Sequence, residues 1–142
     1  MHDLARGQAE LGLEVGIVCD ATTGGEQAKA ALSRLADSCA LGVTRLKMGR
    51  AIGLSDWQNY RAVTKLAADH GVNVLHGHGA KGGAYARLAG RSLKRKRKET
   101  YAFYTPHGGS LHYSPSTLMG RIYIEAERRL ASLTDGLIFE SV

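Results

Sequence analysis

The feature that most constrains the fold is a regular alternation of helix-like and strand-like segments along all 142 residues. Apolar residues every three or four positions predict helices, whereas short apolar or alternating runs predict strands. The predicted helices are Asp3–Leu11, a helix opened by Thr23, a helix opened by Ser55, Gly79–Ala89 and Pro115–Leu133. The predicted strands are Glu14–Cys19, Leu41–Met48, Val72–Leu75, Thr100–Thr105 and Gly136–Phe139. This alternation is typical of parallel strands with right-handed crossovers, so we predict an α/β fold, a Rossmann-like three-layer sandwich with a parallel sheet.

Local signals indicate where two of the helices begin and which faces they bury. Thr23-x-x-Glu26 and Ser55-x-x-Gln58 have the spacing of capping boxes. We expect the following apolar side chains of two helices to point inward: Trp57, Tyr60, Val63, Ala67, Met119, Ile122, Ala126 and Leu130.

The chain opens on a helix candidate, whereas doubly wound sheets of this type place their first strand centrally. The strands Val15–Cys19 and Val72–Leu75 would then have unpaired inner edges. Each buried unpaired amide or carbonyl costs about 1–3 kcal/mol. We therefore expect the first central strand to be missing, and the isolated chain to be poorly stable or to pair with a second copy as a homo-oligomer through these edges.

Composition indicates one soluble domain with an ordinary core. The sequence is 44% hydrophobic and 23% charged, and no run approaches the roughly 18 apolar residues of a membrane-spanning helix. The N-terminus lacks the apolar core of a signal peptide, so we expect a cytoplasmic location. Cys19 and Cys39 lack metal-ligand spacing and are expected to be buried free thiols.

Much of the net charge of +6 comes from five consecutive basic residues, Lys94–Lys98. Such a run is often a solvated loop. It also suits an anionic membrane surface at the inner face of the membrane, or nucleic acid. Nucleic acid is the weaker alternative, because no aromatic residue interrupts the run and no nucleic-acid-binding motif accompanies it.

Two predicted strands end in histidine- and glycine-containing turns. The strand Thr100–Thr105 stops at Pro106 and continues as His107, Gly108, Gly109 and Ser110. The strand Val72–Leu75 continues as His76-Gly77-His78-Gly79. Because ligands of open α/β sheets bind at the carboxyl ends of the strands, these turns predict a site.

The residues of these turns allow several chemistries. Lys81 at a predicted helix start could bind an anionic group such as a lipid phosphate, or be a plain surface lysine, and Gly108, Gly109 and Ser110 could offer amides to a phosphate or a sugar hydroxyl. His76 and His78 are spaced like a metal pair, but no third ligand is near, so we expect no metal. His76 is expected to end its strand in the core, with His78 facing the site. Neither a P-loop nor a dinucleotide fingerprint is present, so we predict no cofactor.

The ordered set of motifs resembles the N-terminal half of group 1 glycosyltransferases, family 4, with the GT-B fold. It comprises His2-Asp3-Leu4-Ala5-Arg6-Gly7-Gln8, Gly16-Ile17-Val18-Cys19-Asp20, His76-Gly77-His78-Gly79-Ala80-Lys81-Gly82-Gly83, Tyr104-Thr105-Pro106-His107-Gly108-Gly109 and the ending Leu133–Ser141. The resemblance covers nearly the whole chain. It implies that residues 1–142 are a partial N-terminal, acceptor-side Rossmann-like domain, truncated at both ends and lacking the second domain that holds most of the nucleotide-sugar site.

The resemblance also implies a function. The full enzyme would be a retaining glycosyltransferase that moves a hexose from a nucleotide sugar to a glycan or lipid-linked acceptor, as in bacterial polysaccharide biosynthesis. His107 would be the catalytic residue that contacts the donor sugar or the charge developing near its anomeric centre, while His78, Lys81, Gly108, Gly109 and Ser110 would bind substrate. The isolated chain is expected to be inactive. The alternatives are a non-catalytic module that binds an anionic ligand, and a nucleic-acid-binding domain that uses Lys94–Lys98.

Overall fold

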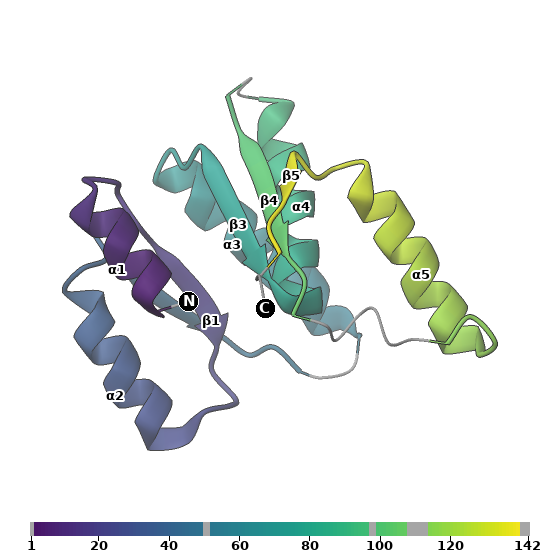
Figure 1. The fold of residues 1–142 in the computed structure, drawn as a ribbon, viewed down its shortest axis with the longest axis horizontal. Coiled ribbons are helices and arrows are strands. Elements are labelled where there is room, and N and C mark those ends of the chain that lie inside the picture. Colours follow the sequence, from purple (N-terminus) through teal and green to yellow (C-terminus); the bar gives the residue numbers. More distant parts are fainter. Residues whose placement is uncertain (1, 50–51, 97–98, 108–113, 140–142) are drawn as a thin grey trace. The chain divides into compact units, whose positions relative to one another are not determined.

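The computed structural model describes residues 2–49, 52–96, 99–107 and 114–139 (Figure 1). Its elements in chain order are α1 (His2–Glu10), β1 (Ile17–Asp20), α2 (Gly25–Ala36), β2 (Val43–Leu46), α3 (Leu54–Asp69), β3 (Val74–His78), α4 (Gly79–Lys94), β4 (Tyr101–Thr105), α5 (Leu118–Ala131) and β5 (Gly136–Leu137). Every predicted element is present in the predicted order. The largest boundary difference is at α4, which continues one and a half turns beyond the predicted end, to Lys94.

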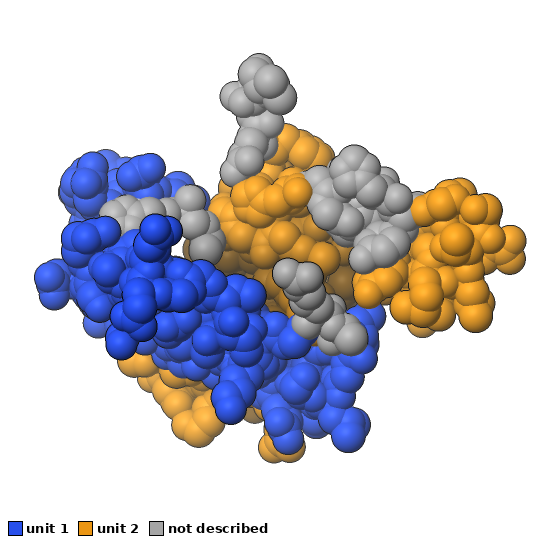
Figure 2. Space-filling model, turned by 90° about the horizontal axis from the view of Figure 1, so that it is seen from below, with its two compact units in different colours: residues 1–59 blue, residues 60–142 orange. Residues whose placement is uncertain are grey.

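The chain divides into two compact units, an N-terminal unit of Met1–Asn59 and a C-terminal unit of Tyr60–Val142 (Figure 2). The N-terminal unit holds the parallel pair β1–β2, and the C-terminal unit holds the parallel sheet β3–β4–β5. The predicted Rossmann-like α/β class is confirmed, with the parallel strands divided between two small sheets. Within the described ranges β1 pairs only with β2, and β3 only with β4.

The C-terminal unit has its core where α3 and α4 meet the sheet. The buried cluster consists of Ala67, Leu75, Ala86, Ala89 and Leu93. Glycines bring α4 close to the strands: a Cβ built on Gly83 would lie 2.3 Å from the ring of Tyr104, and one on Gly90 would lie 2.9 Å from the Cβ of Ala102. The glycines of α4 therefore allow the helix to pack closely on β4.

A buried arginine joins α4 to α5. Arg87 is only 1% exposed, and its Nε donates to the carbonyl of Gly83 at 2.9 Å. Its two terminal nitrogens donate to the carboxylate of Glu127 at 2.9 and 3.0 Å, and the guanidinium lies 4.0 Å from the ring centroid of Tyr104. The charge is thus paired, hydrogen-bonded and placed over an aromatic face.

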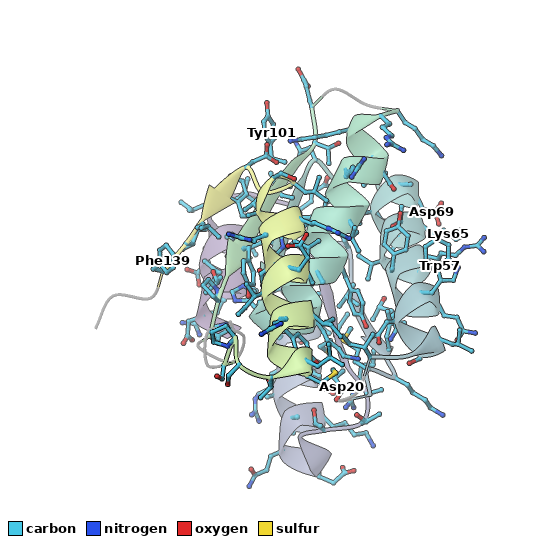
Figure 3. All side chains as sticks on the ribbon, turned by 90° about the vertical axis from the view of Figure 1, so that its right-hand side faces the viewer. Asp20, Trp57, Lys65, Asp69, Tyr101 and Phe139 are labelled. Carbon is cyan, nitrogen blue, oxygen red and sulfur yellow. The ribbon has the colours of Figure 1, made fainter. Side chains whose placement is uncertain are left out.

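The N-terminal unit has a smaller core of Ala5, Leu35 and Cys39. The predicted capping box at Thr23 is wrong, because α2 begins after Gly24, a glycine with a positive φ of 88° and no side-chain cap. The hydroxyl of Thr23 instead donates to the carboxylate of Asp20 at 2.8 Å. That carboxylate (labelled in Figure 3) also accepts from the backbone amide of Met48 at 3.0 Å, which ties the end of β1 to the segment after β2.

Four side chains that were predicted to point inward are exposed. Met119 and Ile122 on α5 are 52% and 47% exposed, Ala126 on α5 is also exposed, and Trp57 on α3 (labelled in Figure 3) is 62% exposed. The periodicity correctly marks an apolar face on α5, but within the described residues no element covers that face around Met119 and Ile122. The second predicted capping box also fails, because α3 begins at Leu54 and the carboxylate of Asp56 accepts from the backbone amide of Gly53 at 2.8 Å.

Candidate active site

The candidate site lies where β3 and β4 end at the same edge of the C-terminal sheet. The two strands are parallel, and His78 stands opposite Thr105 in the register. Gly79 turns the chain from β3 into α4 with a positive φ of 64°, a conformation that glycine adopts without steric cost. His107 follows β4 after Pro106, which cannot extend the ladder. The two strand ends therefore bring distant histidines to one place.

The two histidines at this edge are hydrogen-bonded to each other. His78 Nδ1 and His107 Nε2 are 3.1 Å apart, and the rings are stacked with centroids 5.3 Å apart and an interplanar angle of 19°. One of the two nitrogens must carry the hydrogen, so one imidazole donates and the other accepts. The pair can therefore hold a proton between two rings that face the edge of the sheet.

A third histidine continues this arrangement into the sheet. The Nε2 of His76 is 2.8 Å from the hydroxyl oxygen of the buried Thr105, and its ring centroid is 4.2 Å from that of His78. Burial, and then the positive charge of protonated His107, lower the pKa of His76 below its ordinary value. The prediction that the strand ends at His76 is wrong, because β3 continues through His76 to His78. His76 is half-buried within the strand and favours the neutral form.

The beginning of α4 adds a positive electrostatic field to the site. Its first N–H groups have no intrahelical acceptor, and its first turn holds no acidic residue. His78 is the N-cap, with an extended backbone and no side-chain cap bond. Lys81 stands in this first turn and is half-buried. A helix start with this composition favours anions such as phosphate or carboxylate.

The structure brings some of the predicted site residues together, and others lie outside the residues that it describes. It joins His78 and His107 by a hydrogen bond and places Lys81 one turn into the helix that follows His78. Gly108, Gly109 and Ser110 lie outside the described residues. The sequence interpretation missed Thr105, although its place opposite a histidine-bearing strand end was a usable signal.

At least one cation of the basic run Lys94–Lys98 is already paired within the protein. Lys94 pairs with the carboxylate of Asp135 and lies 5.7 Å from the ring centroid of Tyr101. Arg97 and Lys98 lie outside the described residues. No helix in the described parts of the chain has the length and apolar character needed to span a bilayer. In the same parts, no three His, Cys, Asp or Glu side chains are arranged to hold a metal ion.

Fold and site together define a Rossmann-like domain with a histidine-bearing edge suited to an anionic ligand. The chain matches, over residues 1–141, the family model described as a glycosyl transferase 4-like domain. The chain belongs to this family, which confirms the resemblance seen in the sequence.

Comparison with individual proteins adds little to the family match. No curated protein matches the chain. A solved structure from Ralstonia eutropha JMP134, named an alcohol dehydrogenase, is similar with 15% identity and a TM-score of 0.44. The likeness covers 98% of this chain and 37% of that one. At this TM-score it does not bear on function.

Proposed function

We propose that this chain is the acceptor-side domain of a retaining glycosyltransferase that moves a hexose from a nucleotide sugar to a glycan or lipid-linked acceptor. Membership of the glycosyl transferase 4-like family supports a transferase. The observation that carries the proposal is the hydrogen bond between His78 and His107 at the carboxyl ends of the strands. It holds an imidazole at the edge where ligands of parallel α/β sheets bind.

The chemistry of this edge suits glycosyl transfer. Departure of a nucleoside diphosphate leaves negative charge on the phosphate and positive charge near the anomeric carbon of the sugar. His107 would contact the donor sugar, and its bond to His78 would fix the ring and share the proton. Lys81, with the start of α4, would bind a phosphate of a lipid-linked acceptor. Gly108, Gly109 and Ser110 would add backbone amides on the side of His107.

Residues 1–142 would supply only one wall of such a site. The other wall would come from a second, nucleotide-binding domain. The test is transfer of radiolabelled hexose from a panel of nucleotide sugars, by the chain alone and by the chain mixed with the second domain of a family member. Transfer only in the mixture supports the proposal, whereas full turnover by the chain alone contradicts it.

Two further features extend the proposal to partners and location: the edges of β1 and β3 that pair with no other strand among the described residues, and the basic run. We expect the edges of β1 and β3 to let two copies of the isolated chain associate. Multi-angle light scattering should then show a dimer, and a strictly monomeric, stable chain would contradict this. We place the enzyme in the cytoplasm at the inner membrane face, where polysaccharide precursors are assembled and where the Lys94–Lys98 run would meet anionic lipid.

A further inference from the structure

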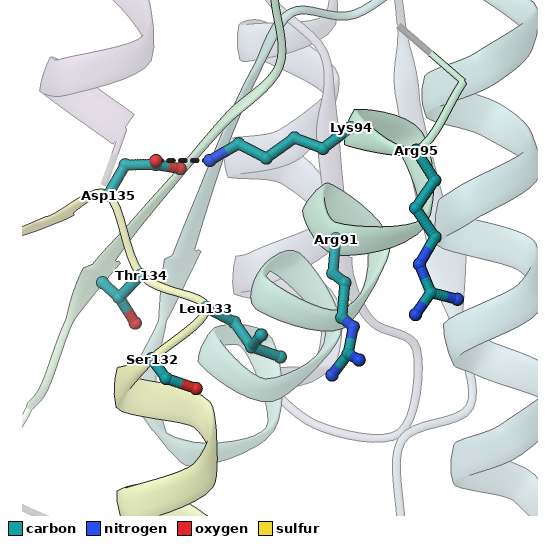
Figure 4. A pocket seen from close by; sticks show the side chains of 7 residues that line it. All are labelled: Arg91, Lys94, Arg95, Ser132, Leu133, Thr134 and Asp135. Carbon is teal, nitrogen blue, oxygen red and sulfur yellow. Dashed lines mark hydrogen bonds and ion pairs between the residues drawn. The ribbon is translucent and has the colours of Figure 1, made fainter. Parts of the chain in front are cut away.

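A second polar site lies at the other end of α4. A pocket of about 270 Å³ lies between the last turns of α4 and the segment that leads from α5 to β5 (Figure 4). It is lined by Arg91, Lys94, Arg95, Ser132, Leu133, Thr134 and Asp135. Because α4 rises about 1.5 Å per residue, its two ends are roughly 24 Å apart. The pocket is therefore separate from the edge that carries His78 and His107.

One cation of the pocket is already paired. Lys94 donates to the carboxylate of Asp135, and that carboxylate also accepts from the backbone amide of Ala102 at 2.7 Å. These bonds lower the pKa of Asp135 against the opposing effect of burial, the largest single influence. Asp135 is thus a fixed anion that neutralises Lys94, and Figure 4 shows the two side chains joined by this ion pair.

The other two cations have no such partner. Among the described residues, the side chain of neither Arg91 nor Arg95 makes a hydrogen bond or ion pair. Arg91 lies in the last turns of α4, and Arg95 is its C-cap in helical conformation. Four residues apart, they share one face, where like charges repel. Figure 4 shows both guanidinium groups extending to the same side, away from the Lys94–Asp135 pair. An anion bound between them would relieve this repulsion.

The hydroxyl groups of the pocket narrow the ligand chemistry. Ser132 Oγ donates to the carbonyl of Arg129 at 2.8 Å, and Thr134 Oγ1 donates to the carbonyl of Leu130 at 2.9 Å. Their hydrogens are thus engaged, so the available donors are the two guanidinium forks. Such forks match the oxygens of a phosphate bidentately. Three cations and one carboxylate leave the lining with a net charge of +2, which suits a phosphate dianion.

We propose that Arg91 and Arg95 form a binding site for a phosphate group, carried by a small ester or a lipid headgroup. The volume of about 270 Å³ is just below the usual range for drug-sized ligands, so it suits a phosphate with a short substituent. The site does not depend on the proposed transferase activity. Cations also stabilise a helix C-terminus without any ligand, and a binding measurement separates that role from this one.

The test uses side-chain NMR of the 142-residue chain. Inorganic phosphate and glycerol 3-phosphate are titrated while the Nε–Hε signals of the arginines are followed. In a second arm, the chain is sedimented with vesicles of phosphatidic acid and with vesicles of phosphatidylcholine. The test variant is Arg91→Gln with Arg95→Gln. The matched control is Arg61→Gln with Arg128→Gln, two exposed arginines outside the pocket that carry the same change of charge.

We expect saturable shifts of two arginine signals, which the test variant removes, with affinity at least about tenfold weaker in that variant and unchanged in the control. Binding of the soluble phosphates would identify a soluble ester as the ligand. Binding to phosphatidic acid vesicles alone, again lost only in the test variant, would identify a lipid headgroup. Absence of binding in both arms, or equal weakening by the control variant, would overturn the proposal.

Discussion

Replacing Glu127 by glutamine should strongly destabilise the C-terminal unit, because it leaves a buried guanidinium without its carboxylate. Arg87 is 1% exposed, and apart from Glu127 it contacts the carbonyl of Gly83 and the ring of Tyr104. Removing one partner of a buried ion pair costs about 3–5 kcal/mol. The Glu127 side chain is 29% exposed, so water can partly replace it, and we expect the lower figure of about 3 kcal/mol.

The matched double variant separates pairing from packing. Arg87→Met combined with Glu127→Leu removes both charges and keeps apolar volume, so it should recover most of the lost stability. Native-state hydrogen exchange at the amides of Ala86 and Ala89, both buried in α4, measures the free energy of opening directly. A loss below about 1 kcal/mol for Glu127→Gln, or a double variant as unstable as the single one, would refute the reasoning.

Three further predictions follow from close contacts and from titrating groups. Gly77→Ala should cost about 1–3 kcal/mol, because a Cβ there would lie 2.4 Å from the carbonyl oxygen of Gly82; an unchanged urea midpoint would contradict it. The pKa of His76 is lowered in the folded chain, so at pH values below about 6.5 the unfolded chain binds more protons at this imidazole and stability should fall as the pH drops. His76→Gln should flatten the dependence of stability on pH in this range, and an equally steep dependence in the variant would contradict the prediction. Hydrogen bonds, first from the Thr22 side chain and then from the backbone of Thr22 and Met48 and the hydroxyl of Thr23, outweigh desolvation and hold the pKa of Asp20 well below its usual range. Its contribution is therefore present above about pH 4 and lost in acid, so Asp20→Asn should melt lower at pH 7 and differ less from wild type at pH 2; the same difference at both values would contradict this.

The order of elements and the meeting of two histidines could be predicted from the sequence. Periodicity identified the helices and strands, and parallel strands place their carboxyl ends at one edge, so the turns that hold His78 and His107 were expected to form one site. The hydrogen bond between the two rings was not predicted. The family motifs confirmed the same topology. The order of elements and the place of the site depend on apolar periods and turn residues, which can be read from short stretches of sequence.

The buried ion pair and the exposed helix face could not be predicted in this way. Nothing near Arg87 indicates burial, because its partner Glu127 lies 40 residues later on another helix. On α5 the apolar period is clear, but a period says only that a face is apolar, not which element covers it. The predicted start of α2 was wrong because the Thr23 side chain is engaged elsewhere. Its hydroxyl donates a hydrogen bond to the carboxylate of Asp20, four residues before Gly24, instead of capping the helix.

The most direct test of the account is hexose transfer after removal of the imidazole at position 107. In an active assembly of this chain with a nucleotide-binding second domain, His107→Ala should lower kcat by about 10²–10³. The matched control, His70→Ala, changes an exposed histidine at the end of α3 and should leave kcat unchanged. Transfer that survives loss of His107, or that falls equally in both variants, would contradict the assignment of the active site to this edge.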